Sequence, residues 1–141
     1  IFDKLKREFI DNNNVKFEHH GFPLDLAALN AEKVLRCIKN KNERLDFLSK
    51  LYEKQDSWAI GSDINNINTK LVKIANNYSL DSDKSNSCLN SEKLENEILE
   101  DRIIADKKYS IKSTPTVFIN EKKYEGKHNY EDFKKAIKKF L

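Results

Sequence analysis

The spacing of apolar residues divides this chain into a long helical middle and two shorter flanks with β-strand character. Between residues 25 and 109, apolar side chains recur at the three- to four-residue period of amphipathic α-helices. In the flanks, residues 15–19 alternate apolar and polar side chains, and residues 116–119 are all β-branched or aromatic. This order predicts an α/β fold of the α+β kind, in which a block of helices is inserted into a frame that contains strands.

The composition excludes several other classes of protein. With 38% hydrophobic residues in periodic order, the 141-residue chain can bury a core and is not disordered. No apolar run approaches the roughly 18 residues that a membrane-spanning helix needs. The 26 basic and 23 acidic residues are mixed along the chain, so the net charge of +3 gives no reason to expect nucleic acid or acidic lipid as a partner.

The inserted block predicts four main helices joined by short connections. The first includes an apolar segment, Leu24 to Ala31, which we expect to be deeply buried. Residues 79–90 are polar, and we expect a loop there with at most one helical turn. Side chains suited to starting the four helices occur at Asp25, Asn42, Asp63 and Ser91.

The flanks predict a helix at residues 1–11, a strand at 15–19 and a β-hairpin near the C-terminal end. In the hairpin, the strand that ends at Ile119 turns through residues 120–122 into a short partner strand at 123–125. Asn129 is suited to cap a closing helix whose apolar side includes Phe133 and Phe140.

The two cysteines leave two interpretations open. Cys37 and Cys88 are far apart in sequence, so they form neither a CxxC motif nor a zinc-binding pattern. In an oxidising compartment they would form a structural disulfide, and closing a loop of about 50 residues would stabilise the fold by roughly 4 kcal/mol. In a reducing compartment Cys37 would be a small buried apolar residue.

Pro115 also leaves two interpretations open. It opens the predicted strand, where its missing N–H does least harm, and this is the usual role of such a proline. The alternative is a cis Thr114–Pro115 bond, which occurs in only about 5–6% of X-Pro bonds.

The remaining candidate residues predict no chemistry. His19 and His20 are neighbours on a predicted strand and point to opposite faces, so they cannot share a metal ion. Trp58, between two predicted helices, is expected to anchor the core. The chain contains no P-loop, dinucleotide-binding, zinc-protease or serine-hydrolase motif, and we expect no cofactor.

Taken in order, these predicted elements and short sequence motifs resemble the DsbA family of thioredoxin-fold disulfide oxidoreductases. The resemblance includes Val15-Lys16-Phe17, Phe22-Pro23-Leu24, the small-residue-rich segment 26–31, the run Thr114-Pro115-Thr116-Val117-Phe118-Ile119-Asn120, and Gly126 before the last helix. It implies a thioredoxin-like domain at 1–23 and 110–141, with 24–109 as the inserted all-helical domain.

The resemblance also implies roles for individual residues. Thr114 and Pro115 match the family's cis-proline loop, which faces the reactive sulfurs and receives an extended substrate. Cys37 and Cys88 fall where some members of the family have a second disulfide, so the resemblance favours a structural bridge between them. Neither cysteine matches the family's catalytic CxxC, which belongs at the N-terminus of the first helix.

We therefore expect the CxxC, and the first strand of the thioredoxin fold, to lie upstream of Ile1. Because the chain contains no Met, we expect that an upstream segment was removed; no signal peptide is visible in these residues, and one would have lain in that segment. Without that strand, buried backbone groups on its two neighbours would lack partners, at about 1–3 kcal/mol each, unless two chains exchanged strands. The 141 residues alone would be inactive in dithiol exchange.

For the intact protein, the resemblance implies a periplasmic disulfide oxidoreductase. Its substrates would be reduced or unfolded exported proteins, and a membrane redox partner would reoxidise it. One alternative is a non-catalytic peptide-binding or chaperone-like module that keeps the fold. Another is an isomerase or glutathione-using enzyme with the same helical insertion.

Overall fold

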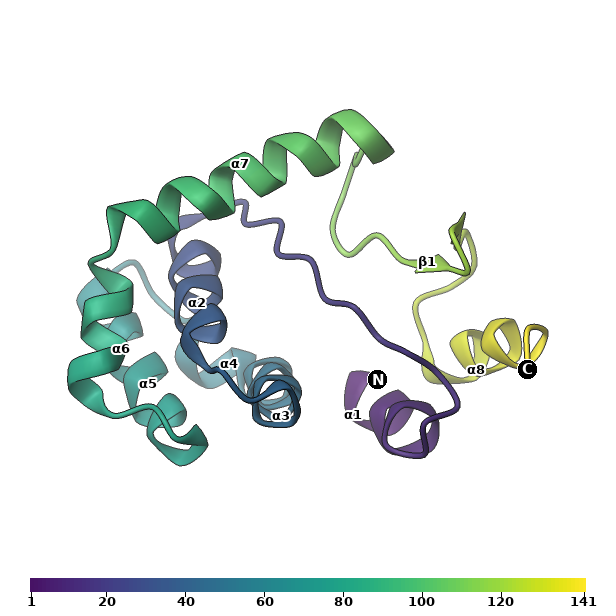
Figure 1. Ribbon diagram of the computed structural model, residues 1–141, viewed down its shortest axis with the longest axis horizontal. Coiled ribbons are helices and arrows are strands. Elements are labelled where there is room, and N and C mark those ends of the chain that lie inside the picture. Colours follow the sequence, from purple (N-terminus) through teal and green to yellow (C-terminus); the bar gives the residue numbers. More distant parts are fainter. The chain divides into compact units, whose positions relative to one another are not determined.

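A computed structural model describes residues 1–141, in which Gly21–Tyr109 form one unit and Ile1–His20 with Ser110–Leu141 form a second. The first unit is entirely helical, and the second contains a β-hairpin and the two terminal helices (Figure 1).

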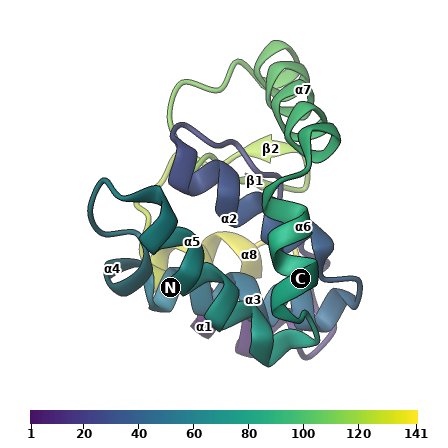
Figure 2. The same cartoon turned by 90° about the vertical axis from the view of Figure 1, so that its left-hand side faces the viewer.

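Helix α2 (Leu26–Cys37) contacts most of the other helices of the first unit. Its neighbours are α3 (Lys41–Glu53), α5 (Ile64–Ala75), α6 (Ser82–Leu89) and α7 (Glu92–Tyr109) (Figure 2). Val34 of α2 and Ile98 of α7 are fully buried, as are Phe47 and Leu71 of α3 and α5. Helices α2, α3, α5 and α7 therefore each turn an apolar side toward a shared core.

Side-chain caps explain where three of these helices begin. Asp25 accepts a hydrogen bond from the Ala28 backbone N–H at 2.8 Å, and Asp63 accepts from Asn65 at 3.0 Å. These contacts confirm the predicted starts at Asp25 and Asp63. Helix α3 starts slightly earlier than predicted, because Asn40 and not Asn42 is its cap.

Two predictions for this unit were wrong. Residues 79–90 contain helix α6, which Asp81 caps through the Lys84 backbone N–H. Its sequence is polar because Ser85 is the only α6 residue whose side chain is fully buried. The start of α2 is not deeply buried: Leu24 and Leu26 are 65% and 50% exposed, and the buried stretch runs from residue 29 to 35.

Trp58 anchors the core as predicted. It closes the short helix α4 (Gln55–Trp58), is 7% exposed, and its indole N–H donates to the Leu51 carbonyl at 2.8 Å. The ring thus fills the join between α3 and α5 while its polar atom stays hydrogen-bonded.

In the second unit, helix α1 (Phe2–Leu5) continues as a π-helical turn (Lys6–Ile10), and α1 contacts the closing helix α8 (Tyr130–Lys138). Asn129 caps α8 through the Asp132 backbone N–H at 2.8 Å, as predicted. Phe133 is buried against the Tyr124 ring, with ring centres 4.6 Å apart, which attaches α8 to the hairpin.

The hairpin consists of β1 (Phe118–Ile119) and β2 (Lys122–Lys123), which pair antiparallel. Ile119 faces Lys122, so the turn contains only Asn120 and Glu121, one residue fewer than predicted. Both turn residues have positive φ, at 49° and 68°, as a type I′ turn requires.

The predicted strand at 15–19 forms no ladder, because the only sheet consists of β1 and β2. Side-chain burial nevertheless alternates along this segment: Val15 and Phe17 are half-buried, and Lys16 and Glu18 are exposed. Phe17 packs against Phe2 with ring centres 5.0 Å apart. An extended segment becomes a strand only when its backbone pairs with another, so side-chain alternation alone did not determine the outcome.

We predict that Asp63→Ala will lower the free energy of unfolding by about 1 kcal/mol, because the first N–H groups of α5 lose their acceptor. Urea denaturation of the protein and the variant measures this difference. Asp106→Ala, at an exposed position within α7, is the matched control and should change stability by less than about 0.5 kcal/mol. Equal effects of the two substitutions would contradict the role of the cap.

Candidate functional site

The first candidate site is the loop that leads into β1. The Thr114–Pro115 peptide bond is cis, which is the less common of the two geometries considered for it, and both residues are exposed. The Thr116 hydroxyl donates to the Ser113 carbonyl at 2.5 Å and closes the loop around the proline. On its far side, the Tyr124 N–H donates to the Val117 carbonyl at 2.8 Å, which extends the hairpin pairing toward Pro115.

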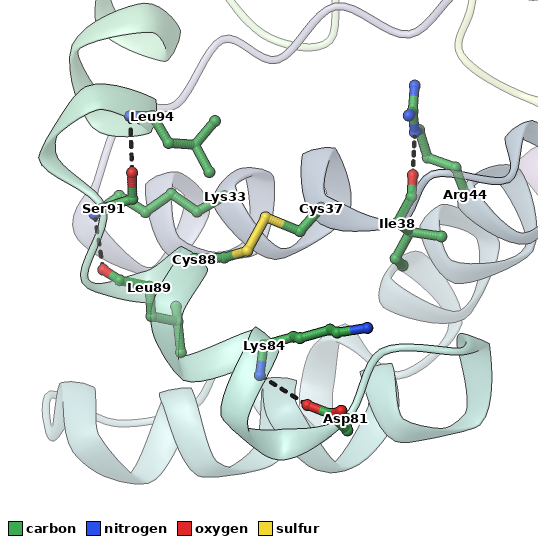
Figure 3. Close-up of a disulfide and its surroundings, with 10 residues drawn as sticks. All are labelled: Lys33, Cys37, Ile38, Arg44, Asp81, Lys84, Cys88, Leu89, Ser91 and Leu94. Carbon is green, nitrogen blue, oxygen red and sulfur yellow. Dashed lines mark hydrogen bonds between the residues drawn. A yellow bond between two sulfur atoms is a disulfide. The ribbon is translucent and has the colours of Figure 1, made fainter.

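The second site is a disulfide between Cys37 and Cys88 (Figure 3). Cys37 is the last residue of α2, and Cys88 lies in the last turn of α6. The Cα atoms are 6.6 Å apart, and the bridge joins positions separated by 51 residues. Of the two interpretations that the sequence left open, the structure contains the bridge.

A buried lysine fixes α6 beside the disulfide. The Lys33 side chain is 6% exposed and extends from α2 to the end of α6, where its Nζ donates to the Leu89 carbonyl at 3.3 Å (Figure 3). The same Nζ lies 3.9 Å from the Glu95 carboxylate of α7. A cation at the C-terminal end of a helix is favourable, because the last carbonyls carry partial negative charge.

The helix ends argue against a catalytic role for this disulfide. A reactive cysteine usually lies at a helix N-terminus, where the positive end of the helix dipole stabilises the thiolate. Cys37 and Cys88 both lie at helix C-termini, where the negative end of the dipole disfavours a thiolate. Their positions suit a structural bridge better than a redox centre.

The residues predicted as site residues fall into different units. Thr114 and Pro115 belong to the unit that contains the hairpin, and Cys37 and Cys88 belong to the helical unit. Within each unit, the structure brings the predicted pair together.

The polar contacts that position α2 were not predicted from the sequence. The Asn30 amide, 5% exposed, donates to Asn68 of α5 at 2.9 Å. Arg36 donates to Glu32 at 3.1 Å and to Asp101 of α7 at 2.9 Å. The i,i+4 spacing of Glu32 and Arg36 was a visible signal, but the partners on α5 and α7 depend on the tertiary structure.

The histidine region offers no metal site. The Glu18 carboxylate lies 3.3 Å from Lys16 and 3.5 Å from the His20 ring nitrogen, and all three side chains are exposed. The hydrogen bond from Lys16 lowers the pKa of Glu18, and the charge of Lys16 adds to the effect. The structure holds no group of three or more histidine, cysteine or acidic side chains arranged to bind a metal ion.

No helix combines the length and the apolar character that crossing a membrane would need.

We predict that reducing the disulfide will lower the free energy of unfolding by roughly 4 kcal/mol, because the denatured chain regains the freedom of a loop of 51 residues. Urea denaturation with and without a phosphine reductant measures the loss. The Cys37→Ala/Cys88→Ala double variant is the control, and its stability should not respond to the reductant. Thiol titration of the unreduced, unfolded chain should find no free thiol, and two reactive thiols would contradict the bridge.

The chain matches a known family model and several curated proteins. The family model described as Thioredoxin matches residues 1–139. Disulfide bond formation protein D of Bacillus subtilis is 29% identical over 150 aligned residues, which cover 100% of this chain and 64% of that protein. A putative protein-disulfide oxidoreductase of Rickettsia prowazekii is 24% identical and is covered over 50% of its length. The chain thus spans between half and two thirds of these curated relatives.

A solved structure agrees with the sequence comparisons. The crystal structure of Wolbachia pipientis alpha-DsbA1 matches with a TM-score of 0.81 at 27% identity, over 99% of this chain and 74% of that one. This likeness confirms the predicted thioredoxin-like fold with a helical insertion. The chain therefore belongs to the thioredoxin family, as a DsbA-like member related to the thiol:disulfide oxidoreductases.

Proposed function

We propose that this chain is part of a protein disulfide oxidoreductase that introduces or exchanges disulfides in exported proteins. The observation that supports this most strongly is the match to a DsbA structure over 99% of the chain, together with relatives named for disulfide formation. The reactive pair would be a CxxC outside these 141 residues, since the cysteines present are 51 positions apart. A periplasmic location and a membrane partner that reoxidises the enzyme are parts of this proposal.

Thr114 and Pro115 would position the substrate. Both residues are exposed, and β1 begins three residues after Pro115. Pro115 has no N–H, so it offers no donor to compete for a bound backbone, whereas the Thr114 backbone can pair with an extended peptide. In this role the loop would hold a substrate cysteine beside the reactive sulfurs.

The proposed reaction is a dithiol–disulfide exchange in two steps. A substrate thiolate attacks one sulfur of the oxidised CxxC, whose S–S bond breaks as a mixed disulfide forms. A second substrate thiolate then attacks the substrate sulfur of that mixed disulfide. The substrate leaves with a new disulfide, and the enzyme keeps two electrons and two protons as a dithiol.

In this proposal Cys37 and Cys88 do not exchange electrons with the substrate. Their position at helix C-termini disfavours the thiolate that would have to attack, and the bridge joins two helices that the core already holds together. The alternative function is a non-catalytic peptide-binding module, and a lack of CxxC in the residues encoded before Ile1 would support it.

The test compares the full-length protein with three altered forms in an assay that oxidises a reduced model protein. We predict that the Cys37→Ala/Cys88→Ala variant will keep most of the activity. Replacing the cysteines of a CxxC outside residues 1–141 should abolish it, and the 141-residue chain alone should show none.

Two results would decide against this assignment. Loss of activity on removing Cys37 and Cys88, with the fold intact by circular dichroism, would make that disulfide the redox centre. A full-length protein that has no CxxC and binds unfolded peptides without oxidising them would support the binding module instead.

A further inference from the structure

A polar cleft lies between helices α5 and α6, which contact each other in the helical unit (Figure 1). Its volume is about 400 Å³, which falls in the range of roughly 300–1,000 Å³ that small-molecule sites in proteins occupy. Its lining includes neither cysteine of the disulfide and no residue of the Pro115 loop. We call it the amide cleft, after the four asparagines that line it, Asn65, Asn68, Asn86 and Asn90.

The lining of the amide cleft is polar and carries no charge. Thr69 and Ser82 add hydroxyl groups to the four carboxamides, and Val72 and Leu89 supply the apolar part. In this chain 35% of the residues are charged, yet none of them lines the cleft. A charged ligand would lose hydration without meeting an opposite charge, and an apolar ligand would leave the carboxamides without partners. The lining therefore selects a neutral ligand rich in hydrogen-bonding groups.

Three of the four carboxamides are free to bind a ligand. Asn65 lies in the first turn of α5, and Asn86 and Asn90 lie one turn apart at the end of α6. All three residues are exposed, and no hydrogen bond within the protein engages their side chains. The two helices thus present unpaired donors and acceptors from both walls of the cleft.

The fourth carboxamide is held in place from the core. The Asn68 side-chain oxygen accepts a hydrogen bond from the NH₂ group of Asn30 of α2 at 2.9 Å, and Asn30 is only 5% exposed. This bond fixes the orientation of the Asn68 carboxamide and leaves its NH₂ group without a partner in the protein. A binding group whose orientation is set before the ligand arrives loses less entropy on binding.

We propose that the amide cleft binds a neutral oligosaccharide. A carboxamide has an acceptor oxygen and a donor NH₂ group, and a sugar hydroxyl is likewise both donor and acceptor. Neighbouring hydroxyls on a sugar ring can therefore pair with both ends of one asparagine, while the C–H face of the ring packs on Val72 and Leu89. An extended peptide fits less well, because its backbone groups pair best with a strand edge, and two helices offer none.

The lining also sets the expected affinity. The cleft has no aromatic ring on which a sugar could stack. Most of its carboxamides are exposed, so hydrogen bonds to a sugar would replace hydrogen bonds to water. We therefore expect a dissociation constant of about 1 mM.

The test titrates the isotope-labelled full-length protein with tri-N-acetylchitotriose, a neutral trisaccharide, and follows the asparagine side-chain NH₂ signals by NMR. We predict saturable shifts of the cleft asparagines. The variant Asn65→Ala/Asn86→Ala removes one carboxamide from each wall and should weaken binding about tenfold. The matched control, Asn66→Ala/Asn77→Ala, removes two exposed asparagines outside the cleft and should change the affinity less than about twofold.

Several outcomes would overturn the proposal. One is the lack of any saturable shift at about 20 mM trisaccharide, and another is equal weakening by the two double variants. The proposal also fails if trigalacturonic acid, which is charged, binds more tightly than the neutral sugar, or if an asparagine-rich peptide occupies the cleft and the sugar does not. Dithiol exchange should be unchanged in Asn65→Ala/Asn86→Ala, so the result stands whether or not the proposed function does.

Discussion

The burial of α2 is the interaction on which the helical unit depends. This helix contacts α3, α5, α6 and α7, and Val34 at its middle is completely buried. Buried polar groups add direction to that packing, because Asn30 must meet Asn68 and Lys33 must meet the end of α6. The Cys37–Cys88 bridge then fixes covalently a contact that burial and hydrogen bonding already define.

The direction of the helices separates two kinds of cysteine chemistry. A helix N-terminus stabilises a thiolate and a helix C-terminus destabilises it, so the same residue type is reactive at one end and inert at the other. Both cysteines of this chain lie at C-terminal ends. Family membership alone would suggest that the Cys37–Cys88 disulfide is redox-active. The position of both cysteines at helix C-termini indicates a structural role instead.

In the other unit, the two-residue turn between β1 and β2 positions the hairpin strands and Tyr124. Because Asn120 and Glu121 both take positive φ, β1 and β2 fold back tightly, and Tyr124 reaches Phe133 of α8. The hairpin therefore presents two different surfaces. The Pro115 loop precedes β1, and the exposed Lys122 and Lys123 form β2.

Features that depend on local chemistry could be predicted from the amino-acid sequence. These were the caps at Asp25, Asp63 and Asn129, the core role of Trp58, and the thioredoxin-like fold that the ordered motifs identified. Long-range contacts settle whether residues 15–19 pair as a strand and whether the polar residues 82–89 form a helix. A strand needs a partner from elsewhere in the fold, and a mostly exposed helix gains its stability from contacts with α2 and α5 that its own composition does not reveal.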